Sequence, residues 1–259
     1  ATGVRCDGAS CNRVEDNVIT GRGGQTSYGV FLQRTGAFVS GNTIRGGCSG
    51  NATGVQLENA FSRVQNNAVL GYSQSDCTNS PPAVQSSVGV RVLVAQGNNE
   101  PDVHSNTIDG GGAAGNCTSR GVEFSAQMMA PNGGRGIFRN NILRAGACNT
   151  ARVNFAELMA NADPRVFENN MLDNAGMPTA LYLDENNTQI NMAAMVDALG
   201  DMIVSGTLSG NSMLVNPPTD IHLQNGSPCK DAGTQTGAPK TDIDGANRDA
   251  MPDIGADEL

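Results

Sequence analysis

The sequence predicts an all-β protein, a right-handed parallel β-helix of about seven coils. Two short motifs recur along the chain, one built around asparagine and one around glycine. In both motifs apolar residues are spaced as in a strand with one buried face. The 259 residues include 33 glycines and no tryptophan, and aromatic residues make up 4%. This composition is typical of many short strands joined by turns.

The asparagine motif reads apolar-x-x-Asn-x-apolar. Its asparagines are Asn17, Asn42, Asn67, Asn106, Asn141, Asn170 and Asn211. Their successive spacings are 25, 25, 39, 35, 29 and 41 residues. A minimum of 25 with variable excess argues against helical repeats of fixed period and favours coils with loops inserted at one corner. We expect the asparagines to occupy one bend, where their side chains bond the backbone and one another in a ladder.

The glycine motif reads Gly-apolar-x-apolar and precedes the asparagine motif in each coil. Clear copies begin at Gly3, Gly29, Gly54, Gly89 and Gly121, and looser copies begin at Arg152 and Ala180. Stacked coils would align the apolar positions of the two motifs as two internal columns. The first predicted column is Val4, Val30, Val55, Val90, Val122, Val153 and Leu181. The second is Val14, Val39, Val64, Val103, Phe138, Phe167 and Leu208.

Four of the seven cysteines follow the asparagine motif at the same corner of successive coils. They are Cys48, Cys77, Cys117 and Cys148. Stacking of adjacent coils predicts the disulfides Cys48–Cys77 and Cys117–Cys148, which would pin inserted loops to their neighbours.

The other three cysteines are less constrained. Cys6 and Cys11 either form a local disulfide, or Cys6 stays a buried thiol in line with Leu32 and Leu57. Cys229 is the odd one and is expected to be free. This cysteine usage in an acidic chain with two lysines indicates an exported protein.

The pattern changes near the C-terminus. Met192, Met195, Val196 and Leu199 fall on one helical face, which predicts a short helix near 191–199. We expect coils over 1–215 and a capping segment over 216–259, together forming one domain.

The final residues carry a recognisable pattern. It comprises Ser227-Pro228, Asp231-Ala232-Gly233, Asp242-Ile243-Asp244-Gly245, Arg248 and Asp253-Ile254-Gly255-Ala256-Asp257-Glu258. This resembles the SPxxDAG…DxDGxxR…DIGAxE ending of secreted bacterial right-handed parallel β-helix proteins of the pectate-lyase-like superfamily. The resemblance implies an extracellular or cell-surface protein. It does not imply an activity, because that superfamily includes lyases, hydrolases, adhesins and structural rods.

The first residues already lie inside the repeat, so we expect a processed or trimmed segment. A first coil without a covering helix would offer unpaired backbone groups. It therefore predicts either a longer chain or a second copy stacked end to end.

Charge and hydropathy argue against nucleic acid as a partner and against a membrane span. The formal net charge is −9 and there are no basic runs, which argues against a nucleic-acid surface. No apolar run is long enough to span a membrane.

The strongest catalytic candidates are His104, Arg139 and Glu168, which occupy the same outward position on successive coils. A lyase needs a base beside groups that neutralise the substrate, and a glycosidase needs two carboxylates. The alternative is a ladder of alternating charges that stabilises neighbouring strands. Glu123, Glu157 and Asp184 are a further set that could share one face, although the repeat does not fix the register of the last two.

The acidic tail offers a calcium loop. Asp242, Asp244 and Asp253 take positions 1, 3 and 12 of a twelve-residue loop, but position 6 is Asn247 rather than glycine. The alternative is that these carboxylates cap turns while Ile243 and Ile254 pack on the last coil. No other cofactor is expected.

Three functions fit these observations. The first is an extracellular structural or adhesive protein that self-associates end to end into a fibre. The second is a polysaccharide lyase or glycoside hydrolase acting on an acidic polysaccharide along the outer face. The third is a carbohydrate-binding module without chemistry. The absence of tryptophan and the scarcity of lysine weaken the enzyme hypothesis.

Overall fold

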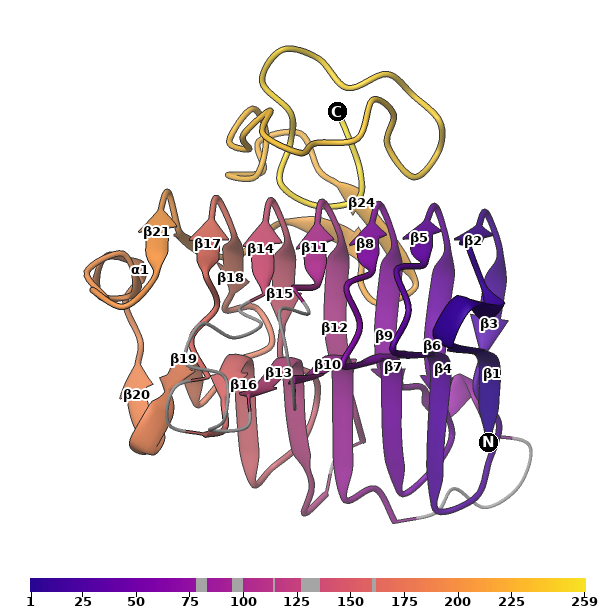
Figure 1. Cartoon of the computed structure of the whole chain (residues 1–259). Helices are drawn as coiled ribbons and strands as arrows, with labels where there is room; N and C mark the ends of the chain where they lie inside the picture. The colour runs from indigo at the N-terminus through magenta and orange to yellow at the C-terminus, as the bar shows by residue number, and fades with distance from the viewer. Residues whose placement is uncertain (78–82, 95–99, 114, 127–135, 160–161) are drawn as a thin grey trace.

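The computed structural model describes the chain except residues 78–82, 95–99, 114, 127–135 and 160–161. The described residues wind into a parallel β-helix, as predicted. Each of seven coils contributes one strand to each of three sheets, which we name A, B and C (Figure 1). Among the described residues, no helix combines the length and apolar character needed to cross a membrane.

Sheet A holds the longest strands. In spatial order they are β1 (Thr2–Asp7), β4 (Thr26–Gln33), β7 (Asn51–Glu58), β10 (Ser86–Val94), β13 (Thr118–Ala126), β16 (Ala151–Glu157), β19 (Ala180–Asp184) and β20 (Thr188–Ile190). All pair in parallel except β20, which is antiparallel to β19.

Sheets B and C are built from shorter strands. Sheet B contains β2 (Arg13–Glu15), β5 (Phe38–Ser40), β8 (Arg63–Gln65), β11 (Asp102–His104), β14 (Ile137–Arg139), β17 (Val166–Glu168) and β21 (Ile203–Ser205). Sheet C contains β3 (Val18–Thr20), β6 (Thr43–Gly47), β9 (Ala68–Tyr72), β12 (Thr107–Gly111), β15 (Ile142–Arg144), β18 (Met171–Asp173) and β22 (Leu208–Gly210). A hairpin of β23 (Leu214–Asn216) and β24 (Asp220–Leu223) follows.

Strand register defines the interior columns. The column along sheet A is Val4, Val30, Val55, Val90, Val122, Phe155 and Tyr182. The prediction was therefore wrong in the last two coils, where Phe155 and Tyr182 replace Val153 and Leu181. The column along sheet B is confirmed up to Phe167 and ends at Val204 rather than Leu208.

The register error traces to the missing glycine. A side chain on Gly29 would come within 2.5 Å of Ile44 Cγ2 and 2.7 Å of Gly54 O, so close approach of the coils requires glycine there. In coil six Asn154 takes this position. Its side chain accepts a hydrogen bond from Ala145 N at 2.8 Å and donates to Asp173 O at 2.9 Å. A polar bridge thus replaces the glycine contact.

The asparagine ladder is confirmed for six rungs. In each of the first five, the backbone N–H of the asparagine donates to the Oδ1 of the next rung at 3.0–3.2 Å. The rung of coil seven is Thr207, which precedes β22 as Asn170 precedes β18. Asn211 was wrongly assigned to the ladder: it lies beyond β22, exposed, and its Oδ1 accepts from Met213 N at 2.8 Å.

In each coil the chain turns from sheet B to sheet C just before the ladder residue, and we call this turn the B–C corner. One residue at each corner has a left-handed conformation, with φ between 50° and 69°. These residues are Asp16, Gly41, Asn66, Ser105, Asn140, Asn169 and Gly206. Asparagine and glycine tolerate this conformation best. The paired asparagines at 66–67, 140–141 and 169–170 therefore have separate roles, the first turning the chain and the second forming the ladder.

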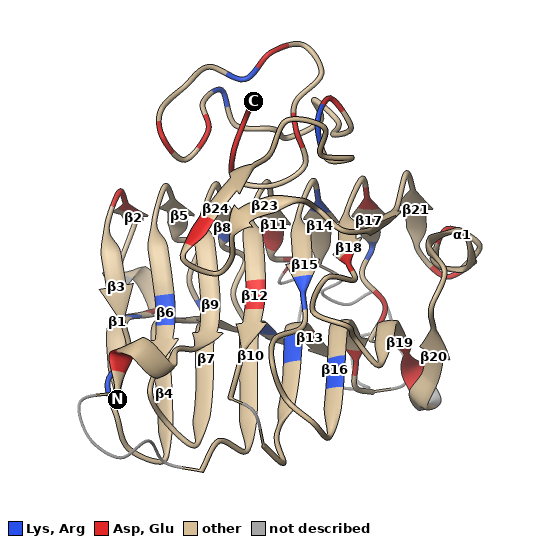
Figure 2. Ribbon diagram, turned by 180° about the vertical axis from the view of Figure 1, so that it is seen from behind, with Lys and Arg blue, Asp and Glu red and all other residues tan. Residues whose placement is uncertain are grey.

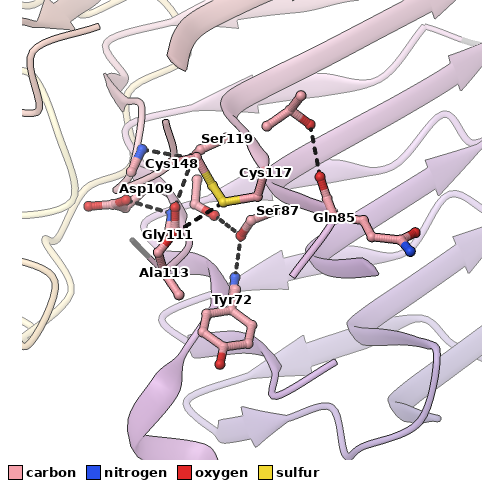
Figure 3. The surroundings of a disulfide bond; sticks show 12 residues. Tyr72, Gln85, Ser87, Asp109, Gly111, Ala113, Cys117, Ser119 and Cys148 are labelled. Atoms are coloured by element: carbon pink, nitrogen blue, oxygen red, sulfur yellow. Dashed lines mark hydrogen bonds between the residues drawn. A yellow bond between two sulfur atoms is a disulfide. The ribbon is translucent and has the colours of Figure 1, made fainter. Parts of the chain in front are cut away.

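Three disulfides staple the coils. Cys48–Cys77 and Cys117–Cys148 form as predicted, and Cys6 pairs with Cys11, so the local bridge is the correct alternative. Figure 3 shows the Cys117–Cys148 corner, where Ser119 Oγ donates to Gly111 O at 2.8 Å. Cys229 is free and buried, as expected, and burial raises the pKa of its thiol to about 12.

The predicted helix is much shorter than expected. One turn, α1 (Ala193–Val196), is present between β20 and β21. Val196 is buried, but Met192 and Met195 are 59% and 51% exposed. The four residues therefore do not form one buried face. Insertions also occur at two corners rather than one, since this segment joins sheet A to sheet B.

The tail does not cap the last coil. It folds back along the B–C corner and lies beside strands β8 to β17 (Figure 1). Ile254 packs with Ile142 and Met171 of coils five and six, which corrects the prediction that it packs on the last coil. Arg248 organises the tail: its guanidinium pairs with Glu258 at 3.0 Å and donates to Gly255 O at 2.8 Å.

Candidate functional site

The predicted catalytic residues lie side by side on sheet B. His104 is in register with Arg139, and Arg139 with Glu168. Arg139 Nε donates to Glu168 Oε2 at 2.7 Å. The His104 ring is engaged elsewhere, with Nδ1 2.9 Å from Asp102 Oδ1 and Nε2 2.7 Å from Gln65 Oε1. This geometry is that of a polar ladder in which each group is bonded to a neighbour.

The tail covers the His104 end of this row. His104 is only 1% exposed, and a methyl group placed on Gly237 would lie 3.5 Å from its Nδ1. The tail therefore keeps a polymeric substrate away from His104. Arg139 and Glu168 stay partly exposed, with side chains 17% and 23% accessible, but each is engaged by the other.

Three corner asparagines hold the tail in place. Asn140 Nδ2 donates to Thr234 O at 2.7 Å and its Oδ1 accepts from Thr234 N at 2.9 Å. Asn169 Nδ2 donates to Ala232 O at 3.0 Å. Asn66 donates to Thr241 O and accepts from Arg248. The sequence did not predict these contacts between the corner asparagines and the tail. Their one visible sign is the Asn-Asn pairs at 66–67, 140–141 and 169–170.

The tail carboxylates divide into two kinds. Asp242 Oδ1 accepts from Asp244 N at 3.0 Å and Ala246 N at 2.8 Å, and Asp253 accepts from Asp231 N at 2.6 Å and Leu259 N at 2.8 Å. These two cap turns, which is the alternative to a calcium loop. Asp242, Asp244 and Asp253 do not form one group of possible metal ligands among the described residues.

Asp244 instead approaches His222. The two ring nitrogens of His222 lie 2.6 Å from Asp220 Oδ1 and 2.7 Å from Asp244 Oδ2. The hydrogen bonds to Asp244 and Asp220 raise the pKa of His222 to about 9. The imidazole is thus a cation at neutral pH and bridges the hairpin to the tail. His222, Asp244 and Asp257 also form one group of possible metal ligands.

The other outward charges pair from coil to coil. Arg91 contacts Glu123 at 2.7 Å, and Arg144 lies between Asp109 at 3.0 Å and Asp173 at 3.4 Å. On sheet C such residues appear as separate bands on β6, β12 and β15 (Figure 2). Burial raises the pKa of Asp109, and Arg144 opposes that shift.

A groove separates sheet C from the hairpin and tail. It has a volume of about 1120 Å³, and its lining includes Asn17, Arg45, Asp220, His222 and Asp244. Sugar sites usually stack aromatic rings on the sugar faces, and the lining contains none. The groove can hold a polar ligand through charged and amide groups.

The face considered for Glu123, Glu157 and Asp184 does not exist as one unit. Glu123 pairs with Ala156 in register and lies outside with Arg91. Glu157 and Asp184 instead approach each other and Glu185, and each offers a carboxylate oxygen within 4.8 Å of the others. The reason is the pairing of β13 with β16, which aligns Glu157 with the buried Phe124 and so turns it toward the interior.

No protein-family model matches the chain, and a comparison with curated proteins finds no match. We therefore infer function from the geometry of this chain alone.

Proposed function

We propose that the protein is an extracellular structural β-helix, a stapled rod whose outer charges brace one coil against the next. The observation that carries this proposal is the bonded row on sheet B. His104 is buried beneath the tail, and Arg139 and Glu168, with side chains 17% and 23% exposed, are paired with each other.

The coil-to-coil ion pairs support the same role. Arg91–Glu123, Arg139–Glu168 and Arg144–Asp109 each join side chains of consecutive coils. A general base must reach a proton on the substrate, whereas these carboxylates are occupied by guanidinium groups. Such pairs resist shear between coils, which suits a rod.

An activity assay tests the structural role against the enzyme hypothesis. The protein is incubated with acidic and neutral polysaccharides, and new reducing ends and unsaturated products are measured. We expect no turnover. Turnover that Glu168→Gln abolishes would overturn the proposal. The control is Glu58→Gln on sheet A, a half-buried carboxylate outside the row, which should not change any turnover.

The proposal includes end-to-end association through β1. Tyr28 N donates to Ala1 O at 2.9 Å, which in a parallel ladder directs the N–H of Thr2 to the opposite edge. Sedimentation velocity at rising concentration should show growing species, and Thr2→Pro should reduce them by removing that donor. A strict monomer at all concentrations contradicts this part of the proposal.

Extracellular placement rests on the three disulfides, which are compatible with an oxidising compartment. Fractionation of producing cells, with thiol counting by mass spectrometry, tests it. We expect extracellular protein with one free thiol per chain.

Glycan binding without chemistry is a second candidate, favoured by the polar groove of about 1120 Å³. Calorimetry with neutral and acidic oligosaccharides tests it. Saturable binding that Arg45→Ala removes would support a binding module, and the structural proposal predicts no saturable heat.

A further inference from the structure

The interior of the β-helix changes character near its C-terminal end. One internal column on sheet A runs through Cys6, Leu32, Leu57, Val92 and Phe124. Glu157 is the next member, in register with Phe124. Leu183 pairs with Ala156, so Asp184 follows Glu157 one coil further. An apolar column therefore ends in two carboxylates.

These carboxylates belong to a cluster of five acidic residues. Glu157 ends β16, Asp184 ends β19 and Glu185 begins the short 3-10 turn Glu185–Asn187. The three residues can place one oxygen each within 4.8 Å of one another. Asp163, Glu185 and Asp201 form a second group with the same property, so Glu185 is common to both.

Glu157 is buried and incompletely bonded. Its side chain is 3% exposed. Tyr182 OH donates to Oε1, but Oε2 of Glu157 and Oε2 of Glu185 receive no hydrogen bond within the described part of the chain. A buried carboxylate oxygen without a donor costs about 1–3 kcal/mol or more if charged. The site is therefore incomplete as it stands.

Three acidic neighbours in the described part of the chain act on Glu157. They are Asp163, Asp184 and Glu185. Burial, reinforced by these neighbours, raises the pKa of Glu157 to about 10. Burial and a hydrogen bond with Asp184 raise the pKa of Glu185 to about 7.

We propose that Glu157, Asp184 and Glu185 bind one divalent cation of the calcium class, which locks coil six to coil seven. The donors are all carboxylate oxygens, the ligands that hard cations take. Calcium accepts six to eight oxygens in irregular geometry, and Asp163 and Asp201 stand close enough to complete its shell through water. Zinc would favour histidine or cysteine, and the triad contains neither.

Binding would replace protons on the carboxyl groups by the cation. Glu157 and Glu185 must be deprotonated to act as ligands, so calcium affinity should rise with pH and binding should release protons. Both effects can be measured by calorimetry in buffers of different ionisation enthalpy.

Terbium luminescence provides a direct probe. The chain has three tyrosines and no tryptophan, and Tyr182 is hydrogen-bonded to Glu157. Excitation of tyrosine should therefore give terbium emission that saturates and that calcium displaces. Tyr182→Phe should lose most of the emission but keep calcium binding by calorimetry.

Two matched variants separate the interior site from the tail. Glu157→Gln resembles the protonated carboxyl, so it should fold without calcium as the parent does, yet bind calcium at least about tenfold more weakly. Asp244→Asn removes a carboxylate from the His222 group and should leave calcium affinity unchanged. Melting in millimolar calcium against chelator should raise the Tm of the parent and of Asp244→Asn, but not of Glu157→Gln.

Several results would overturn the proposal. One is a parent protein with no calcium-dependent Tm and no saturable terbium emission. Another is undiminished binding by Glu157→Gln. Loss of binding in Asp244→Asn but not in Glu157→Gln would assign the cation to the tail.

Discussion

The first four coils and the last three solve the same packing problem with different side chains. In coils one to four the interior column of sheet A is Val4, Val30, Val55 and Val90. In coils five to seven the interior is filled by contacting rings, Phe124, Phe138, Phe155, Phe167 and Tyr182, whose centroids lie 5.0–6.4 Å apart.

Polarity follows the same division. The early coils close their interior with aliphatic groups and an unbroken asparagine ladder. The late coils bury Glu157 beside the half-buried Asp184, and Thr207 replaces the seventh rung. Coils that keep the repeat have an apolar interior, whereas the coils that depart from it hold the buried carboxylate.

The largest expected effect is the removal of a ring from the late coils. Phe155 is fully buried and contacts four other rings. Phe155→Ala should lower the free energy of unfolding by about 4 kcal/mol, because it leaves a cavity. Val55→Ala at the same column position should cost about 2 kcal/mol. Urea unfolding measures both, and equal losses would contradict the contrast between the two regions.

The disulfides offer a second contrast. Cys117–Cys148 spans 31 residues and Cys6–Cys11 spans 5. Replacing both cysteines by serine should cost about 3.5 kcal/mol for the long bridge and about 2 kcal/mol for the short one, from the entropy of loop closure. Both variants make two identical substitutions, so each controls for the other. A larger loss from the short bridge would show that local packing outweighs loop length.

The acidic interior should make stability depend on pH. The pKa of Glu157 is raised from 4.5 to about 10, so the folded state holds a proton that the unfolded state has lost. In calcium-free buffer this group should lower stability progressively as pH rises from about 4.5 to about 10. Glu157→Gln should flatten that decline in a series of melting curves. An unchanged slope would place the carboxyl in water.

The smallest effect should come from restoring the ladder. Thr207 Oγ1 is buried and has no hydrogen-bond partner among the described residues. Thr207→Asn should provide an acceptor for Asn170 N, as each earlier rung does, and raise the free energy of unfolding by about 1 kcal/mol. Thr207→Ser is the control and should bring no gain. A loss in Thr207→Asn would mean that coil seven is too distorted for a rung.

The disulfides and the early interior columns could be predicted from the sequence, because each coil carries a recognisable asparagine or glycine from which to count. Counting from the ladder asparagine placed Cys48 near Cys77 and Cys117 near Cys148, because all four follow it at the same corner of successive coils. The same method failed where the landmark changed. Asn154 stands where glycine was expected, and Gly206-Thr207 replaces the asparagine turn, so Val153 and Leu208 were assigned in place of Phe155 and Val204.

The tail contacts and the acidic cluster do not follow from the repeat for a different reason. Each depends on contacts between segments that share no repeat, such as Asn140 with Thr234 or Glu157 with Glu185. The doubled asparagines and a carboxylate in an apolar column were visible signals. Their meaning needed the register, which only the folded chain supplies.

The attachment of the tail to three coils restricts how the number of coils can change. Solenoids commonly change length by duplicating a repeat, because each repeat contacts only its neighbours. Here the tail is fastened to Asn66, Asn140 and Asn169, which belong to coils three, five and six. An extra coil inserted between them would separate the anchor points by about another 4.8 Å. The length of the tail between its anchor points therefore limits how many coils can lie between Asn66 and Asn169.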